Sequence, residues 1–173
     1  ISGINKIEEN LILSGEQGAG KTKILNNLAC QICKPENVSA NNIIPIKLKA
    51  PAIKKKGFDI EKCVKDEITE LAEDFVDEKV FEKYKVVLFV DDLDLLKNED
   101  KEILVQNTKD YCTKNSTHFV LTYRKSEFNF DSEINSIRIH NFNNKQVEAF
   151  VTKFFEGTDR GAKFIQILKE SGI

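Results

Sequence analysis

Apolar positions along this chain follow two alternating patterns. Short, continuous apolar runs predict strands at about 10–14, 43–48, 86–90, 118–122 and 136–140. Between and after them, apolar residues recur every three or four positions, which predicts amphipathic helices at about 21–33, 60–75, from 98, after 143 and at 161–170. Alternation of strands and helices is typical of a parallel sheet with helices on both faces, so we predict an α/β fold.

Individual residues refine this pattern. Pro45 cannot donate a hydrogen bond to a neighbouring strand, so the second strand should lie at a sheet edge. The run 86–90 is apolar at every position, as expected of a central strand covered on both faces. Pro35 should end the first helix, and Asn143 with Gln146 predicts a capped start to a later one.

A glycine-rich segment separates the first predicted strand from the first helix. It reads Gly15, Glu16, Gln17, Gly18, Ala19, Gly20, Lys21, Thr22 and matches the phosphate-binding pattern G-x-x-x-x-G-K-[ST]. Its glycines let successive backbone N–H groups point at a phosphate chain, and the next helix directs its positive end there. We expect Lys21 to reach the β- and γ-phosphates and the Thr22 hydroxyl to hold Mg²⁺. The segment therefore predicts binding of a nucleoside triphosphate.

Acidic residues follow the third predicted strand directly. Asp91 stands at its carboxyl end, and Asp92 and Asp94 come next. In an open α/β sheet this end lies beside the glycine loop, so Asp91 should orient magnesium through water. A second acid can position or deprotonate the attacking water. We favour Asp94 for that role and keep Asp92 as the alternative.

Arg124 ends the fourth predicted strand. We expect this strand to insert between the first and the third, which would place Arg124 next to the γ-phosphate. A guanidinium there can detect that phosphate and its loss on hydrolysis.

Composition limits the remaining possibilities. The chain has 173 residues and a formal net charge of −2, which gives no general attraction to nucleic acid or membrane. It contains no apolar run long enough to cross a bilayer. It starts with Ile and contains no Met, so we expect a fragment of a longer protein. Its four cysteines, including the pair Cys30 and Cys33, are predicted to be buried free thiols, which suits the cytoplasm. The basic segment 54–57 is predicted to be a solvated loop.

Several stretches together resemble the NACHT and NB-ARC type of signal-transduction ATPase, the STAND NTPases. They are GEQGAGKT at 15–22, IPIKLKA at 44–50, VVLFVDDLDLL at 86–96, HFVLTYRKSEF at 118–128 and IRIHNFNNKQVEAFVTKFF at 137–155. The resemblance implies a three-layer P-loop NTPase sandwich with strand order 5-1-4-3-2. It implies an NTPase core at 1–141 and, at 142–173, the start of a helical subdomain. The resemblance implies that Asp91 matches the family's magnesium-binding acid and that Arg124 matches its arginine after strand four. It implies that the family's second acid corresponds to Asp92 or Asp94.

The resemblance also implies a function. Such proteins bind ADP at rest, exchange it for ATP and self-associate when a sensor region detects its trigger, in immunity and antiviral defence. We therefore expect a slow, regulatory ATPase whose effector and sensor domains lie elsewhere in the same chain, with nucleic acid not expected as a partner. An initiator-like or helicase-loader-like ATPase acting with nucleic acid is the alternative, and a non-enzymatic nucleotide-binding scaffold is a third.

Overall fold

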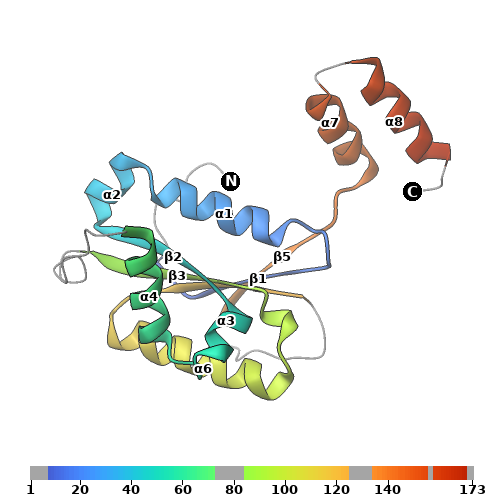
Figure 1. The fold of residues 1–173 in the computed structure, drawn as a ribbon. Helices are drawn as coiled ribbons and strands as arrows, with labels where there is room; N and C mark the ends of the chain where they lie inside the picture. The colour runs from blue at the N-terminus through green and yellow to red at the C-terminus, as the bar shows by residue number, and fades with distance from the viewer. Residues whose placement is uncertain (1–7, 73–83, 125–133, 156–157, 171–173) are drawn as a thin grey trace. The chain divides into compact units, whose positions relative to one another are not determined.

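A five-stranded parallel sheet in the order β2-β3-β4-β1-β5 forms the centre of the first part of the chain (Figure 1). The computed structural model describes residues 8–72, 84–124, 134–155 and 158–170. The strands are β1 (Leu11–Gly15), β2 (Ile43–Lys49), β3 (Lys85–Asp91), β4 (Phe119–Tyr123) and β5 (Asn135–Ile139). This order confirms the prediction 5-1-4-3-2. It also places Pro45 on an edge strand, and β1 between two strands that come more than a hundred residues later.

Helices cover both faces of this sheet (Figure 1). They are α1 (Lys21–Ile32), α2 (Pro35–Asn41), α3 (Ala50–Lys55), α4 (Ile60–Ala72) and α6 (Asn98–Lys114), with a short 3-10 helix, η1 (Leu93–Leu95), after β3. In Figure 1, α1 lies on one face, and α3, α4 and α6 lie on the other. The three-layer α/β architecture is therefore confirmed. None of the helices among the described residues is long and apolar enough to cross a bilayer.

β3 contributes side chains to two hydrophobic cores because its side chains alternate between the two faces of the sheet. Val87 and Phe89 pack with residues of α1, including Leu25 and Leu28. The alternate positions of β3 join the larger core that contains residues of α3, α4 and α6; these positions are Val86, Leu88 and Val90. Burial on both sides explains why this strand is apolar throughout.

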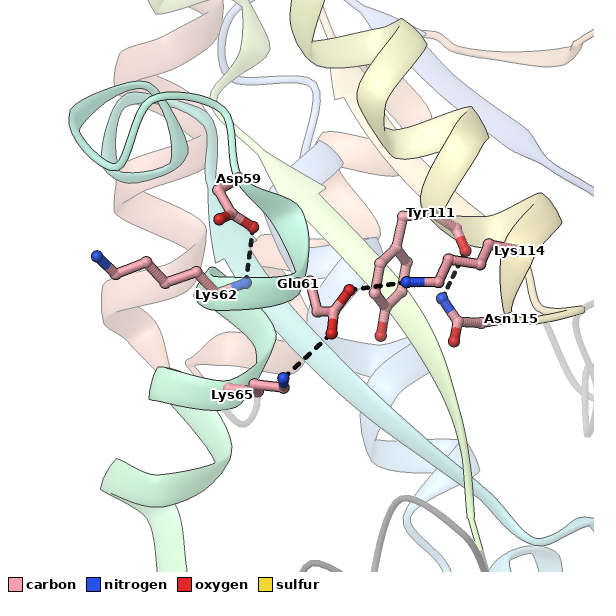
Figure 2. Close-up of polar contacts among 7 residues, drawn as sticks. All are labelled: Asp59, Glu61, Lys62, Lys65, Tyr111, Lys114 and Asn115. Carbon is pink, nitrogen blue, oxygen red and sulfur yellow. Dashed lines mark hydrogen bonds and ion pairs between the residues drawn. The ribbon is translucent and has the colours of Figure 1, made fainter.

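Polar contacts fix the start of α4 and join it to α6 (Figure 2). Oδ1 of Asp59 accepts a hydrogen bond from the backbone N–H of Lys62 at 2.9 Å and so caps the start of the helix. Glu61 pairs with Lys65 on its own helix at 3.1 Å and with Lys114 on α6 at 3.0 Å. All three side chains of these pairs are about half exposed or more, so each pair adds little stability. Their effect is to match the charges of two adjacent helices.

Two short helices were not predicted. Pro35 does end α1, but it also begins α2, where a proline at the first helical position needs no N–H partner. α3 contains Lys54 and Lys55, so the first half of the basic segment at 54–57 is helical and the prediction of a loop there was wrong for these two residues. Lys54 pairs with Asp100 at 2.6 Å, and Lys56 with Asp66 at 2.8 Å.

Burial corrects one further prediction. Cys30 and Cys33 are exposed, because the buried face of α1 is formed by Leu25, Leu28 and Ile32 and both thiols lie off it. Cys63 and Cys112 are buried as predicted, and all four cysteines are free. On α6, Ile103 is 47% exposed. The buried positions of α6 are Lys101, Leu104, Val105, Thr108 and Cys112. The part of the predicted helix 60–75 that follows Ala72 lies outside the described residues.

The chain divides into two compact units, Ile1–Ile139 and His140–Ile173. The second contains α7 (Asn144–Phe154) and α8 (Asp159–Glu170). Asn143 caps α7: its side chain accepts from the N–H of Gln146 at 3.0 Å, and the Gln146 side chain accepts from the N–H of Asn143 at 3.0 Å. The predicted capping box is confirmed. That this unit begins a larger helical subdomain stays a prediction.

Candidate functional site

The glycine loop leaves β1 and turns sharply into α1. Gly18 and Gly20 have φ angles of 80° and 89°, in the left-handed region that side chains disfavour. Gly15 is needed for a different reason: a Cβ there would lie 2.6 Å from the backbone oxygen of Ile139 on β5. Glu16 is exposed. The glycine pattern therefore answers two separate steric demands, backbone conformation and close strand packing.

The ammonium of Lys21 lies over the start of this loop. Its Nζ donates to the backbone oxygens of Gly15 at 2.9 Å and Glu16 at 3.0 Å. The side chain therefore folds back from the first turn of α1 across the loop. Its positive charge stands beside the backbone N–H groups at the helix start, so both contributions to an anion site come from the same short segment.

Asp91 is held at the end of β3 by neighbours from three directions. Its Oδ1 accepts from the Oγ1 hydroxyl of Thr122 on β4 and from the backbone N–H of Asp92 at 3.1 Å. The Thr22 hydroxyl, at the start of α1, also hydrogen-bonds to this carboxylate. Only 4% of the Asp91 side chain is exposed. Asp91, which was predicted to orient magnesium, is therefore fixed in place and in contact with the Thr22 hydroxyl, which was predicted to hold the same ion.

These contacts determine the charge of Asp91. Burial by itself raises its pKa, but hydrogen bonds from Thr122, Thr22 and the Asp92 N–H, with the nearby Lys47 ammonium, outweigh burial and hold the pKa below the ordinary value of 3.8. The group is a carboxylate at neutral pH. It can therefore accept a hydrogen bond from cation-bound water or coordinate a cation directly.

Two contributors were not predicted. Lys47, on β2, has its Nζ 3.4 Å from Oδ2 of Asp91 and donates to Oδ1 of Asn26, on α1, at 2.8 Å. Thr122 was assigned only to a strand. One available signal was the position of Lys47 between Ile46 and Leu48, which puts a charge on the opposite face of the strand from two buried residues. No local pattern pointed to Asn26.

A cavity of about 730 Å³ opens beside this loop. It is lined by Gln17, Gly18, Gly20, Lys21, Thr22, Lys23, Asn26, Asp91, Asp92, Asp94, Leu95, Thr122 and Arg124. Asp92 adopts φ 63° and starts η1, whose tight turn brings Asp94 back to the same cavity. The structure thus brings both candidate acids and Arg124 together with most of the loop. Gly15, Glu16 and Ala19 do not line the cavity.

The oxygen donors at this site fit magnesium. Mg²⁺ commonly uses one or two protein oxygens and completes its shell with water and substrate phosphates. Thr22 and Asp91 supply a hydroxyl and a carboxylate in mutual contact. Among the described residues, no group of three or more His, Cys, Asp or Glu could hold a metal by itself. The arrangement therefore suits a cation that arrives with a phosphate ligand, rather than a metal site made only of protein side chains.

Solved structures similar to this chain share its fold. They include C. elegans PCH-2, with a TM-score of 0.56, 16% identity, and coverage of 90% of this chain and 41% of the other. AMPPCP-bound DnaA from Aquifex aeolicus has a TM-score of 0.53 and 14% identity, with coverage of 90% of this chain and 47% of the other. Drosophila ORC bound to DNA has a TM-score of 0.56 and 15% identity, with coverage of 99% of this chain and 46% of the other. The chain thus spans less than half the length of each.

Sequence comparison gives the family. No curated protein matches the chain. The sequence model for the ATPase family associated with various cellular activities (AAA) matches residues 11–145, which includes the glycine loop, the acidic residues after β3 and Arg124. This range is most of the chain, and its fold is that of a P-loop NTPase. The protein belongs to the AAA family of ATPases.

Proposed function

We propose that this chain is the ATP-binding, slowly hydrolysing regulatory domain of a multidomain signalling or defence protein, in which the bound nucleotide controls self-association. One observation supports nucleotide chemistry above all others. A single cavity is lined by the glycine loop, Lys21, Thr22, Asp91 and Arg124, which come from segments far apart in the chain. Their charges and donors complement a magnesium–triphosphate.

Each residue has a role that its position supports. The N–H groups of the loop and the start of α1 bind the β-phosphate, and Lys21 bridges the β- and γ-phosphates. Thr22 and Asp91 would hold magnesium, which would neutralise charge on the phosphate oxygens. Arg124 contacts the γ-phosphate from the end of β4.

Water activation is assigned to Asp94, with Asp92 as the alternative. Both line the cavity. The backbone N–H of Asp92 is engaged by Asp91, and its left-handed conformation serves the turn into η1. Asp94, which is exposed, lies within η1 itself, in the turn that returns the chain to the cavity. These features suit a structural role for Asp92 and a chemical one for Asp94.

Nucleotide binding is tested by calorimetric titration of ATP and ADP with magnesium. Lys21→Ala should weaken ATP binding by at least about tenfold, since it removes a charge-assisted contact to phosphate. Lys85→Ala is the matched control, because this exposed lysine begins β3 at the opposite end of the sheet. Equal affinities for the wild type and Lys21→Ala would place the nucleotide elsewhere.

Hydrolysis is tested by comparing Asp94→Asn with Asp92→Asn. Asp94→Asn should retain ATP binding and lose turnover by about a hundredfold or more, the usual contribution of a general base. Undiminished turnover in Asp94→Asn with loss in Asp92→Asn would move the role to Asp92.

A role with nucleic acid is the second candidate. The similar structures of DNA-bound ORC and of DnaA favour it, and they leave the expectation that nucleic acid is not a partner without support. In favour of a regulatory ATPase, the basic residues Lys54 and Lys56 are paired with carboxylates. ATP turnover with and without DNA separates the two: strong stimulation by DNA favours the initiator- or loader-like function.

The remaining parts of the proposal concern assembly. We assign the chain to the NACHT/NB-ARC type, place it in the cytoplasm, and take 142–173 as the start of its helical subdomain. Molar mass measured by light scattering should rise with a non-hydrolysable ATP analogue and stay lower with ADP. Identical masses in both states, using the full-length protein, would contradict nucleotide control of self-association.

A further inference from the structure

The edge strand β2 brings a lysine to the carboxylate assigned to magnesium. Lys47 pairs in register with Phe89, two residues before Asp91 on β3, so Lys47 and Asp91 project from the same face of the sheet. That face carries α1, from which Asn26 accepts a hydrogen bond from Lys47 Nζ at 2.8 Å. The ammonium is therefore directed at Asp91 by β2 and anchored by α1.

The two oxygens of Asp91 have different surroundings. Oδ1 accepts from Thr122 and from the backbone N–H of Asp92. Oδ2 lies 3.4 Å from Nζ of Lys47. The Thr22 hydroxyl also hydrogen-bonds to this carboxylate. Since Oδ1 is committed to Thr122 and to the Asp92 N–H, Oδ2 is the oxygen better able to face a hydrated cation, and Lys47 is at that oxygen.

The two partners also differ in freedom. The Asp91 side chain is 4% exposed, whereas that of Lys47 is 32% exposed. The carboxylate is fixed by its hydrogen bonds, while the long lysine side chain can rotate toward solvent. A cation that approaches Oδ2 can therefore displace Lys47 without moving Asp91.

We propose that Lys47 competes with Mg²⁺ for Oδ2 of Asp91 and so sets the magnesium concentration at which nucleotide binds. This inference rests on the proposed function of the site. The ammonium balances the charge of the carboxylate and repels a divalent cation at the same oxygen. Lys47 is thus a positioning residue that acts through Asp91. Magnesium enters only together with a phosphate chain, whose own charge offsets the repulsion.

The test is a calorimetric titration of ADP at a series of free Mg²⁺ concentrations. Lys47→Gln should reach half-maximal binding at a magnesium concentration about fivefold lower than wild type, because a nearby positive charge is removed. Lys47→Arg keeps the charge and should behave like wild type. Lys85→Gln is the matched control, since Lys85 lies six residues before Asp91 on β3, about 20 Å away along the strand. It should leave the magnesium requirement unchanged.

A double variant shows whether the effect passes through Asp91. In an Asp91→Asn background, Lys47→Gln should no longer shift the magnesium requirement. If Lys47→Gln instead weakens ADP binding at saturating Mg²⁺ and leaves the half-maximal concentration unchanged, Lys47 contacts phosphate directly and the inference is overturned. A shift that persists in the double variant overturns it too.

Folding and the proposed function are controlled separately. Thermal unfolding checks each variant, and Lys47→Met, which keeps the length of the apolar stem, replaces Lys47→Gln if the latter fails to fold. A wild-type protein that binds no ADP at any magnesium concentration contradicts the proposed function itself. Normal wild-type binding with an unshifted magnesium requirement in both Lys47→Gln and Lys47→Met contradicts only the inference about Lys47.

Discussion

The hydroxyl of Thr122 donates a hydrogen bond to Oδ1 of Asp91 and so ties the carboxyl end of β4 to that of β3. Thr122 is 1% exposed, and Asp91 is 3% exposed. A buried carboxylate costs free energy unless hydrogen bonds satisfy it. The bond therefore supports both the sheet and the charge of the candidate magnesium residue.

Replacing Thr122 by valine tests this relationship. Thr122→Val keeps the shape but removes the donor, and we expect the free energy of unfolding to fall by about 1.5–3 kcal/mol, as for hydrogen bonds to charged groups. Urea denaturation measures it. Thr69→Val is the control, because the exposed Thr69 hydroxyl bonds to the Lys65 carbonyl within α4; its effect should stay within about 0.5 kcal/mol. Equal losses in the two variants would contradict a special role for Thr122.

Asp91 should make stability depend on pH on the acid side. Its pKa in the folded chain is below the ordinary value of 3.8, so the unfolded chain binds more protons between the two values. The stabilisation is therefore complete above the unfolded pKa and is lost as pH falls through the folded pKa. We expect the difference in unfolding free energy between wild type and Asp91→Asn to shrink as pH falls from about 5 to about 3. Denaturant titrations at several pH values measure it, and parallel curves would contradict the assignment.

Gly15 should resist substitution for a steric reason. In Gly15→Ala the new Cβ would meet the Ile139 backbone oxygen at 2.6 Å, so β5 would have to shift away from β1. We expect a loss of about 1–3 kcal/mol in unfolding free energy, as for overpacked sites. In Gly57→Ala the Cβ meets nothing within 4 Å, but φ is +70°, which costs about 1 kcal/mol. A smaller loss at Gly15 than at Gly57 would show that the strands yield easily.

The four cysteines should differ in reactivity. Cys30 and Cys33 are exposed, whereas Cys63 and Cys112 are buried. Burial raises the pKa of Cys112 to about 12, and it also raises the pKa of Cys63 and that of Cys33. Since the thiolate is the reactive form, iodoacetamide at mildly alkaline pH should modify Cys30 and Cys33 in the folded protein, and Cys63 and Cys112 only after unfolding. Peptide mass spectrometry reads the sites. Rapid modification of Cys112 in folded protein would contradict its burial.

The edge position of β2 and the buried position of β3 followed from the sequence because the signals were local and strong, whereas the full strand order was implied by the resemblance to STAND NTPases. Pro45 marked an edge, and the uniformly apolar 86–90 marked a strand buried on both faces. The short helices did not follow, because a proline can end one helix and begin another: Pro35 does both. Only the packing of 35–41 against α1 and β2 decides between these readings.

The buried face of α6 includes polar side chains, which hydrophobic periodicity does not identify. Lys101 is 5% exposed, donates to Oδ1 of Asn98 at 3.0 Å and lies 5.8 Å from the centre of the Tyr123 ring. Thr108 is fully buried and donates to the backbone oxygen of Leu104. These partners make burial of polar groups acceptable. Ile103 lies outside this face. Hydrophobic periodicity alone cannot detect such satisfied polar positions.

Within the candidate site, motif residues were predicted and supporting residues were not. The loop and Asp91 carry their own sequence pattern, so their convergence in one cavity was expected. Lys47, Asn26 and Thr122 contribute only because β2, α1 and β4 bring them to Asp91. Such contacts depend on strand register and helix rotation, which no short segment of sequence specifies.

The place of β1 between β4 and β5 has a consequence for synthesis on the ribosome. Leu11 pairs with Val120 on one side and with Asn135 on the other, so both partners of the strand that leads into the glycine loop are made more than a hundred residues after it. Closing such distant pairs is slow compared with forming local helices. The emerging chain thus carries its phosphate loop without either neighbouring strand until β4 has left the exit tunnel, and without the second until Ile139 has left it. Nucleotide capture by a nascent chain would report when the strands beside the loop have joined.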